Sequence, residues 1–325
     1  MAQPTNLFDR YDATKSVRED LANIIYNISP EDTVFMSNVG RDKASQTFTE
    51  WQTDALAAAS ASNAQVEGDD AAADSLAATN RVGNYTQISR KVVATSGTLE
   101  AANTAGFRSA MAYQMAKAAS ELKRDMESAL LANNAAVAGN SSTARETAGL
   151  PAWLRSNVSK AGDGSNPTMS STNDGYPNAA RTDGTQRAFT ETMLQDVIQS
   201  VWTNGGTPKL LMVGPYNKRV ASGFSGIGAT RFNVNGAKPS TIIGAADIYV
   251  SDFGNVSIVP SRFQRERDAF VVDPEYAAVS YLRNFKTEEL AKTGDSMKKM
   301  IVVEYALKVR TEAAHGIIAD LTTTA

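Results

Sequence analysis

The stretch "ALAAASASNAQVEGDDAAADSLAATN", Ala55 to Asn80, decides how this chain is organised. It contains no aromatic residue, and its only large aliphatic residues are Leu56, Val66 and Leu76. The segment is too polar to build a core, and connections longer than about 12–15 residues are uncommon inside compact domains. It is therefore either disordered or ordered by contact with something outside its own fold.

Segments typical of β-strands flank this stretch on both sides. Both "SQTFTEWQTD" (45–54) and "VGNYTQISRKVVATS" (82–96) are rich in the threonine, aromatic and β-branched residues that strands favour. We expect them to pair as the arms of an extended hairpin, residues 45–98, with the polar run at its tip. Asp69 and Asp70, ahead of "AAADSLAA", are placed to cap one or two helical turns there.

The clearest single element follows the hairpin. Apolar residues recur at steps of three and four between residues 107 and 130, which predicts a helix over about residues 104–136 with one apolar face. At 1.5 Å per residue it would be about 45–50 Å long, far beyond the usual three turns. Lys117–Glu121 and Lys123–Glu127 are spaced as i,i+4 ion pairs on its wetter side. We interpret this helix as a structural spine.

The segments around the spine have weaker patterns. Residues 1–44 are expected to form an arm, in which "TKSVREDLANIIYNISPED" predicts a short amphipathic helix that ends before Pro30. Residues 139–188 are loop-like, apart from "GLPAWLRSNV" at 149–158, whose leucine and tryptophan side chains are expected to pin the loop to the body.

From Thr190 onward, short helices and strands alternate. Thr190 is expected to cap an apolar helix, "PKLLMVGP" to form a buried strand, and "DIYVSDFGNVSIVPS" a hairpin that turns at Gly254–Asn255. With the strand "AFVVD", these elements predict a compact mixed α/β domain over residues 190–278. The last β-rich stretch, from Met300 to about Thr311, is expected to fold back beside the spine because it has no core of its own.

Composition excludes several classes of function. The 325 residues are 42% hydrophobic and 21% charged, as in a globular protein, and a formal net charge of −3 argues against a protein that mainly coats phosphate backbones. The chain has no cysteine and one histidine, His315, which nearly excludes disulfides, thiolate metal sites, a catalytic triad and a multi-histidine metal site. Without an apolar stretch of about 18 residues or a signal pattern, we expect a soluble chain made in the cytoplasm.

Other motifs have structural interpretations. "GFSGIG", residues 223–228, lacks the Lys-Ser/Thr of a phosphate-binding loop and is interpreted as a turn or an inter-subunit loop. The acids around Asp70 lack the ladder of a calcium-binding loop and are interpreted as solvated. The methionines of the spine fit helix packing, and His315, without partner residues, fits a place in the C-terminal sheet. No catalytic, metal-binding or cofactor-binding residue is predicted.

The order of these elements, and several short motifs, resemble one known family. The chain resembles the major capsid protein of tailed bacteriophages, with the Hong-Kong-ninety-seven-type fold, at "TEWQTDAL", "TQISRKVVATSGT", "GLPAWL", "LRNFKTEELAKTGDS" and "AAHGIIADL". The resemblance implies an α+β fold with five parts: an N-arm (1–44), an extended E-loop hairpin (45–98), a P domain with the spine helix and a long loop (99–189), an A domain (190–278) and a C-terminal β segment of the P domain (279–325).

That resemblance also implies a function in assembly. Subunits would associate as hexamers and pentamers into an icosahedral head around double-stranded DNA, and the hairpin of one subunit would lie across its neighbour. The partners expected are other copies of the chain, a separate scaffolding protein (since residues 1–44 leave no room for a fused one), a portal, cement proteins and weakly bound DNA, in the virion of a phage made in the host bacterial cytoplasm. No lysine lies between Lys43 and Lys91, so we expect no lysine–asparagine crosslink through the hairpin.

The residues expected at contacts between subunits lie in the hairpin, the glycine-rich loop and the basic cluster "RFQRER". They are Trp51, Asp69, Asp70, Arg81, Tyr85, Gly223, Gly226, Gly228, Arg262 and Arg265. The basic cluster has an alternative role in facing DNA, but the internal Glu266 and the net acidic chain favour ion pairs.

Two other functions remain open at this point. An intracellular enzyme with a mobile lid at 55–80 would need a pocket with a paired acid and base, and the sequence offers no such pair of evident spacing. A nucleic-acid binder would show DNA affinity that depends strongly on salt as a free subunit.

Overall fold

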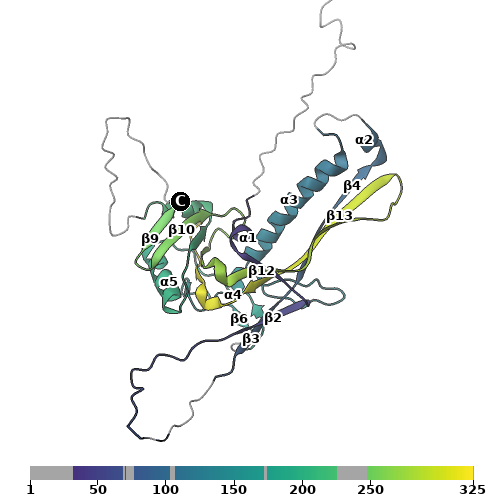
Figure 1. Cartoon of the computed structure of the whole chain (residues 1–325). Coiled ribbons are helices and arrows are strands. Elements are labelled where there is room, and N and C mark those ends of the chain that lie inside the picture. Colours follow the sequence, from purple (N-terminus) through teal and green to yellow (C-terminus); the bar gives the residue numbers. More distant parts are fainter. Residues whose placement is uncertain are drawn as a thin grey trace, which may run out of the picture.

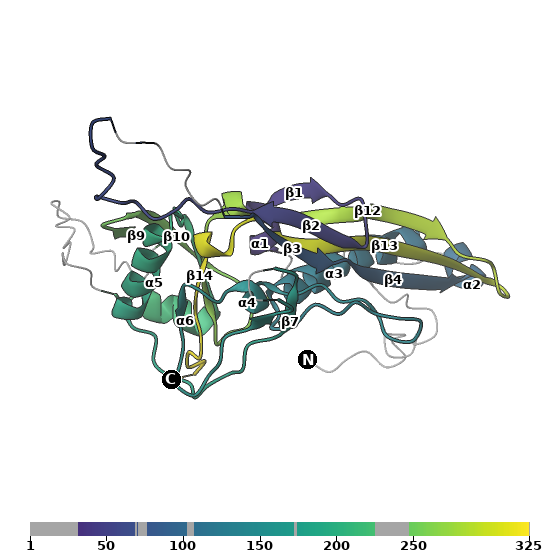
Figure 2. The ribbon, with the colours of Figure 1, turned by 90° about the horizontal axis from the view of Figure 1, so that it is seen from below.

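Two sheets and one long helix organise the chain. The computed structural model describes residues 32–68, 70, 77–102, 107–171, 174–224 and 247–324, so the predicted helix of the N-arm lies outside the described residues. The elements are arranged along one axis, with a six-stranded sheet at one end and a four-stranded sheet running to the other (Figures 1 and 2).

The four-stranded sheet is built from segments far apart in the sequence. Its strand order is β1-β12-β13-β4, with bounds Gly40–Lys43, Ala277–Glu289, Ser296–Val309 and Gln87–Ser96. β12 and β13 form a long antiparallel hairpin in which Tyr281 faces Tyr305, and β1 runs parallel to β12. Residue patterning predicted the β-rich stretch 300–311, which lies mainly in β13, while β12, whose outer half is mostly exposed, falls almost entirely within the C-terminal β segment (279–325) that the resemblance implied.

The spine helix α3, Ala110–Leu131, packs along this sheet. Its buried face includes most of the predicted stripe, namely Met111, Ala118, Leu122, Met126 and Leu130. It is shorter than the predicted 104–136, about 33 Å at 1.5 Å per residue. The Ser109 side chain caps its first turn, and a separate short helix, α2 (Gly97–Ala101), precedes it.

Asparagine side chains explain where the spine ends. Ala132, at the C-cap, is extended, and the next two residues are tied to the long loop rather than to the helix. The Asn133 side chain donates to the carbonyl of Arg181 (2.8 Å) and the Asn134 side chain to that of Thr147 (2.6 Å). These bonds compete with helix continuation, as asparagine commonly does.

One predicted hairpin arm serves two sheets. β2 (Phe48–Thr53) pairs with β3 (Asn80–Tyr85) in antiparallel register, as the sequence suggested. The prediction that 82–96 is one continuous arm is wrong beyond Tyr85: β4 leaves the hairpin and pairs with β13 from Gln87 to Ser96. The change occurs at Thr86, whose hydroxyl donates to the buried Glu304 carboxylate at 2.9 Å.

The six-stranded sheet has the order β5-β14-β11-β8-β10-β9. The bounds of these strands are Val158–Ser159, Gly316–Ile318, Ala269–Val272, Leu210–Val213, Gly254–Pro260 and Ile248–Ser251. Two helices pack against the sheet, α5 (Glu191–Thr203) and α6 (Pro215–Ala221). Thr190 caps α5 as predicted, while the β9–β10 turn lies at residues 252–253, two positions before the predicted one.

The C-terminal segment requires one correction. The stretch from Met300 to about Thr311 lies mainly in β13 and packs beside the spine, as predicted. The resemblance assigned all of residues 279–325 to one segment of the P domain, but β14 inserts between β5 and β11 of the six-stranded sheet. The apolar run Gly316–Ala319 is buried on both faces there, which a central strand requires. His315, expected in the sheet beside the spine, instead lies just before β14.

Smaller elements fill the junction between the sheets. They are α1 (Val34–Asn38), α4 (Leu150–Trp153), β6 (Thr168–Met169), β7 (Pro177–Ala179) and the 3₁₀ turns Pro274–Tyr276 and Glu312–Ala314. Leu150, Trp153 and Leu154 are buried in the main core, as predicted for the segment that pins the long loop.

Candidate functional site

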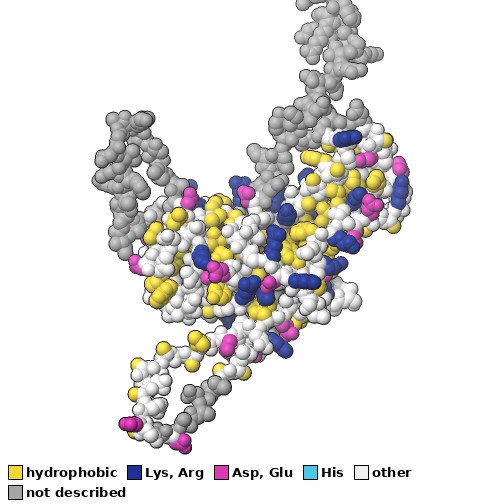
Figure 3. Space-filling model, viewed as in Figure 1, with side chains coloured by type: hydrophobic (Ala, Val, Ile, Leu, Met, Phe, Trp, Pro, Cys, Tyr) yellow, Lys and Arg dark blue, Asp and Glu magenta, His cyan; other side chains and the backbone are white. Residues whose placement is uncertain are grey.

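The hairpin tip stands away from its own subunit. Every described residue from Asp54 to Thr79 is exposed, with Leu56 fully accessible and Val66 77% accessible. Figures 1 and 3 show this loop projecting from the body, with acidic side chains at its far end. Apolar side chains left in water gain free energy when another surface covers them, so this loop is a candidate contact element.

The base of the hairpin is anchored within the same chain. Trp51 on β2 packs against Trp153 of α4, with ring centroids 5.4 Å apart. Tyr85 on β3 packs edge-on against Tyr176 at 5.2 Å. Arg81 pairs across the strands with Glu50 at 3.2 Å. Three of the predicted inter-subunit residues therefore have partners in their own subunit, where they orient the hairpin.

Backbone hydrogen bonds clamp the hairpin base to the long loop. The Gly83 N–H donates to the carbonyl of Gly175, and the Gly175 N–H donates to the carbonyl of Arg81, both at 2.8 Å. The Arg81 N–H donates to the Asp174 carboxylate at 2.6 Å. Gly175 has φ +87°, a conformation that L side chains rarely adopt, so glycine is required for this clamp.

The basic cluster around residue 265 is engaged mainly within the subunit. Arg265 pairs with Asp183 and, at 3.1 Å, with Asp268. Arg267 pairs with Asp183 at 3.2 Å and with Asp320 at 2.9 Å. Burial raises the pKa of Asp268 to about 6, against the opposing effect of Arg265. This network ties the C-terminal segment to the long loop.

Arg262, which precedes that network in the sequence, differs from it. Its side chain is exposed and lines a hollow beside the start of α1, together with Asp32 and Pro260.

The other predicted contact residues lie in the glycine-rich loop and at the hairpin tip. Gly223 is exposed after α6, whereas Gly226, Gly228 and Asp69 lie outside the described residues. Asp70 is described and exposed at the hairpin tip.

His315 has an internal structural role. It is fully buried, and its Nδ1 accepts a hydrogen bond from the Asp273 N–H at 3.3 Å. Burial lowers its pKa to about 4, so the imidazole is neutral at neutral pH. Within the described ranges, no cluster of three metal-ligating side chains occurs, and none of the helices there is long and apolar enough to cross a bilayer.

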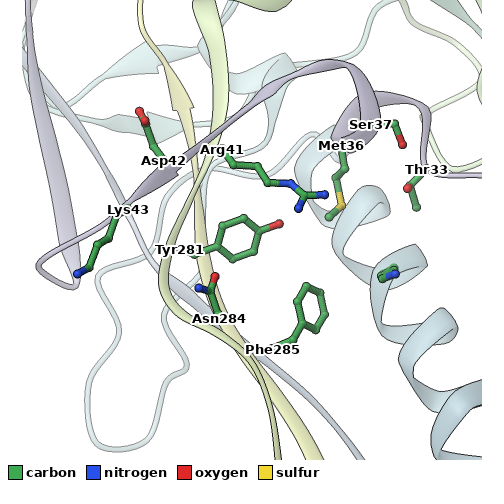
Figure 4. A pocket seen from close by; sticks show the side chains of 10 residues that line it. Thr33, Met36, Ser37, Arg41, Asp42, Lys43, Tyr281, Asn284 and Phe285 are labelled. Carbon is green, nitrogen blue, oxygen red and sulfur yellow. The ribbon is translucent and has the colours of Figure 1, made fainter.

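The structure also holds a basic pocket that was not predicted from the sequence. A cavity of about 760 Å³ lies between α1, β1, α3 and β12 (Figure 4). Its charged and aromatic lining includes Arg41, Lys43, Lys123, Tyr281 and Phe285. These residues are separated by up to about 240 positions in the chain, so only the β1–β12 pairing and the α1–α3 contact reveal the pocket. The sole local signal is the charged strand "GRDK".

A prediction about the spine was also wrong. Glu127 does not pair with Lys123 on the wet side of the helix but is fully buried. Its carboxylate accepts hydrogen bonds from the N–H groups of Phe35 and Met36 in α1. Burial raises the pKa of Glu127, and the two backbone bonds oppose that effect. The other predicted pair, Lys117 and Glu121, is present at 3.9 Å.

Solved structures share the whole architecture. The chain superposes on the Cyanophage A-1(L) capsid asymmetric unit with a TM-score of 0.70 and 12% identity, covering 98% of this chain and 100% of that chain. A Gordonia phage Cozz structure matches with a TM-score of 0.60 at 11% identity, covering 97% and 94% of the two chains. A holo-SrpI encapsulin complex from Synechococcus elongatus PCC 7942 matches at 0.56 and 12%, covering 98% and 97%. The predicted Hong-Kong-ninety-seven-type capsid fold is confirmed.

Sequence comparison agrees with the fold. The chain is 28% identical to the major capsid protein of Escherichia phage Phieco32 over 352 aligned positions, which cover 98% of this chain and 97% of that protein. The function is therefore structural: the chain assembles with its copies into the capsid of a phage. The family model described as SU10 major capsid protein matches residues 3–322, and the chain belongs to that family.

Proposed function

We propose that this major capsid protein associates as hexamers and pentamers, which close into an icosahedral head around double-stranded DNA. The observation that carries the proposal is the contrast within the hairpin. Its base is fixed by Trp51 and the Gly175 clamp, while the described tip residues make an exposed loop with Leu56 fully in water. A rigid base with an uncovered tip suits a segment that lies across a neighbouring subunit.

Reach and composition of the tip fit that role. About 13 residues separate each strand end from the middle of the loop, which corresponds to a reach of about 40 Å at roughly 3.3 Å per extended residue. Its many alanine and serine residues allow close approach of another backbone. In a closed lattice, many such modest contacts add up, so no single contact needs to be strong.

Other assigned contacts belong to the same proposal. We assign Gly223, Gly226 and Gly228 to a loop of the A domain (190–278) at contacts between subunits, and Arg262 to a neighbouring subunit. Four of the predicted residues orient these surfaces from within their own subunit: Trp51, Arg81, Tyr85 and Arg265. Their direct contact with a neighbouring subunit remains a prediction. We also propose the division of the chain into an N-arm, E-loop, P domain and A domain.

Further partners follow from head assembly. We propose a separate scaffolding protein, a portal and cement proteins as binding partners, weak non-specific contact with packaged DNA, and synthesis in the host bacterial cytoplasm. The absence of lysine between Lys43 and Lys91 supports a shell without lysine–asparagine crosslinks through the hairpin.

Deletion of residues 58–77 tests the role of the hairpin. We expect the shortened subunit to keep its circular dichroism spectrum and its melting temperature, because the described residues of this segment add nothing to the core. Electron microscopy should show no shells. A matched variant replaces the same residues with a Gly-Ser run of equal length. It tests whether shell assembly needs only the length of the loop or also its side chains. Normal shells from the deletion variant would remove the proposed role and would favour a lid or a dispensable loop.

A further inference from the structure

The basic pocket carries an excess of positive charge that the described part of its own subunit does not neutralise. Arg41, Lys43 and Lys123 are exposed, and no ion pair links any of them to a described carboxylate. The acid within the pocket lining, Asp42, is already paired with Lys308 at 2.9 Å and Arg310 at 3.4 Å. Three cations around one cavity repel each other, which an anionic occupant would relieve.

The pocket also has an aromatic wall. Tyr281 and Phe285 lie on β12 with ring centroids 6.4 Å apart, and Figure 4 shows both side chains among the lining residues. Phe285 is 40% accessible, so its ring offers apolar surface to an occupant. The site thus combines cationic and apolar surface in a volume typical of ligand clefts.

The hairpin tip has the complementary chemistry. Within "VEGDDAAADSL", residues 66–76, four carboxylates are interleaved with alanines and bounded by Val66 and Leu76. These acids are Glu67, Asp69, Asp70 and Asp74. No Lys or Arg occurs between Lys43 and Arg81, so the whole loop is purely anionic.

We propose that the basic pocket receives the acidic hairpin tip of a second copy of the chain. This inference rests on the proposed function, because it names the surface on which the hairpin lies. The tip carboxylates pair with Arg41, Lys43 and Lys123, and the flanking aliphatic residues pack against Phe285. The occupant comes from another subunit, because the clamp at Gly175 and the Trp51–Trp153 contact fix the direction in which the hairpin leaves its own body.

The favoured occupant is a peptide rather than DNA. A duplex binds to open basic surfaces, whereas these cations surround a cavity with an aromatic wall. An acidic loop with apolar ends satisfies both parts of the pocket.

Site-directed crosslinking tests the proposal in the full chain. Because the protein has no cysteine, Asp70→Cys in one population and Ser37→Cys, at the pocket, in another provide specific reporters. Co-assembled shells treated with a short bismaleimide should yield crosslinked dimers on a denaturing gel. Asn255→Cys, exposed on β10, replaces Ser37→Cys as the matched control and should yield none.

Charge exchange provides an independent test. Arg41→Glu with Lys43→Glu should lower the yield of shells at least tenfold, as should Asp69→Lys with Asp70→Lys. Combining the four substitutions should restore a large part of that yield, because opposite charges then face each other again. Arg90→Glu with Lys292→Glu, exposed cations outside the pocket, makes the same change in net charge and should leave assembly within about twofold.

The outcomes separate this inference from the proposed function. If deletion of 58–77 blocks assembly but no crosslink to the pocket forms and the exchange restores nothing, the hairpin role stands and the pocket inference falls. If the pocket reversal weakens salt-dependent binding of the free subunit to a short DNA duplex without affecting crosslinks or shells, the occupant is DNA and the inference is overturned. Crosslinks and restored yield together would support it.

Discussion

The buried carboxylate of Glu127 accepts a hydrogen bond from the backbone N–H of Phe35 at 2.6 Å, which joins the spine helix to the short helix α1. A second bond from the Met36 N–H, at 2.9 Å, uses the other carboxylate oxygen. Both donors belong to the first turn of α1, where N–H groups have no partner within the helix. This single side chain therefore fixes the wall of the basic pocket to the spine.

Replacing Glu127 with alanine should destabilise the subunit. The change leaves one buried and one partly buried backbone donor without partners, and the loss of a buried hydrogen bond costs about 1–3 kcal/mol. We expect the free energy of unfolding, measured in urea, to fall by about 2–4 kcal/mol. Glu121→Ala on the same helix is the control; its carboxylate makes only two long ion pairs, at 3.9 Å, and its loss should cost less than about 1 kcal/mol. Equal effects of the two substitutions would contradict this account.

Glu304→Ala should have a larger effect. This buried carboxylate contacts Arg145 at 2.6 Å, Arg283 at 2.7 Å and the Thr86 hydroxyl at 2.9 Å, so it joins the long loop, β12 and the end of the hairpin. Removing Glu304 leaves the Arg145 guanidinium, which is only 29% accessible, without compensation, and breaking a buried ion pair typically costs about 3–5 kcal/mol. Arg283 is 51% accessible and stays solvated.

The control for Glu304 is Glu289→Ala. Its ion pair with Lys299 has a similar length, 2.8 Å, but the glutamate side chain is 76% accessible. We expect its removal to change the free energy of unfolding by less than about 1 kcal/mol. Chemical denaturation of both variants beside the wild type measures the difference, and a small effect at Glu304 would show that this hub is not structural.

These two glutamates show how far sequence reasoning extends. The apolar period of the spine and the cap at Thr190 are local signals, and both predicted the elements found. Whether Glu127 faces water or the core depends on α1, which lies about 90 residues earlier in the chain. An i,i+4 spacing describes one helix face only and carries no information about what covers it.

Non-local pairing likewise explains the errors in strand assignment. β4 has the composition of a hairpin arm, yet its partner is β13, more than 200 residues later. The basic pocket depends on the same kind of pairing, since β1 lies beside β12. By contrast, the exposed hairpin tip could be identified directly, because a long polar run without core residues needs no knowledge of its neighbours.

The single histidine should make the stability of the subunit sensitive to acid. Burial lowers the pKa of His315 to about 4, below the ordinary value of 6.5 for an unfolded chain. Between these values the unfolded chain binds a proton that the native state does not, so stability falls as pH falls. His315 should therefore lower the free energy of unfolding by about 2–3 kcal/mol as the pH falls from 7 to 4.5. This loss should be absent in His315→Gln.

The measurement must compare the two proteins at each pH. Burial raises the pKa of Asp268 to about 6, so this carboxyl contributes with the opposite sign: the native state binds its proton first, and stability rises as pH falls from about 6 toward 4. Asp268 is present in both proteins, so subtracting the unfolding free energy of His315→Gln from that of the wild type at the same pH cancels the contribution of Asp268. A difference that does not change with pH would contradict a neutral buried His315.

A single methyl group at Gly149 should disrupt the support of the hairpin. A Cβ atom at this position would lie 1.9 Å from the backbone carbonyl oxygen of Ala132, where the spine ends, and backbone cannot move aside as a side chain can. Gly149 is also the N-cap residue of α4, the helix that carries Trp153 under Trp51. We expect Gly149→Ala to cost about 3 kcal/mol or more by overpacking and to change the near-ultraviolet circular dichroism of the two tryptophans.

Gly162→Ala is the matched control: it is an exposed glycine of the same loop whose Cβ would meet nothing within 4 Å. Its thermal midpoint should equal or slightly exceed that of the wild type, because alanine restricts the unfolded chain. If Gly149→Ala melted with the control, the spine end and α4 would not be packed as closely as their backbone atoms require.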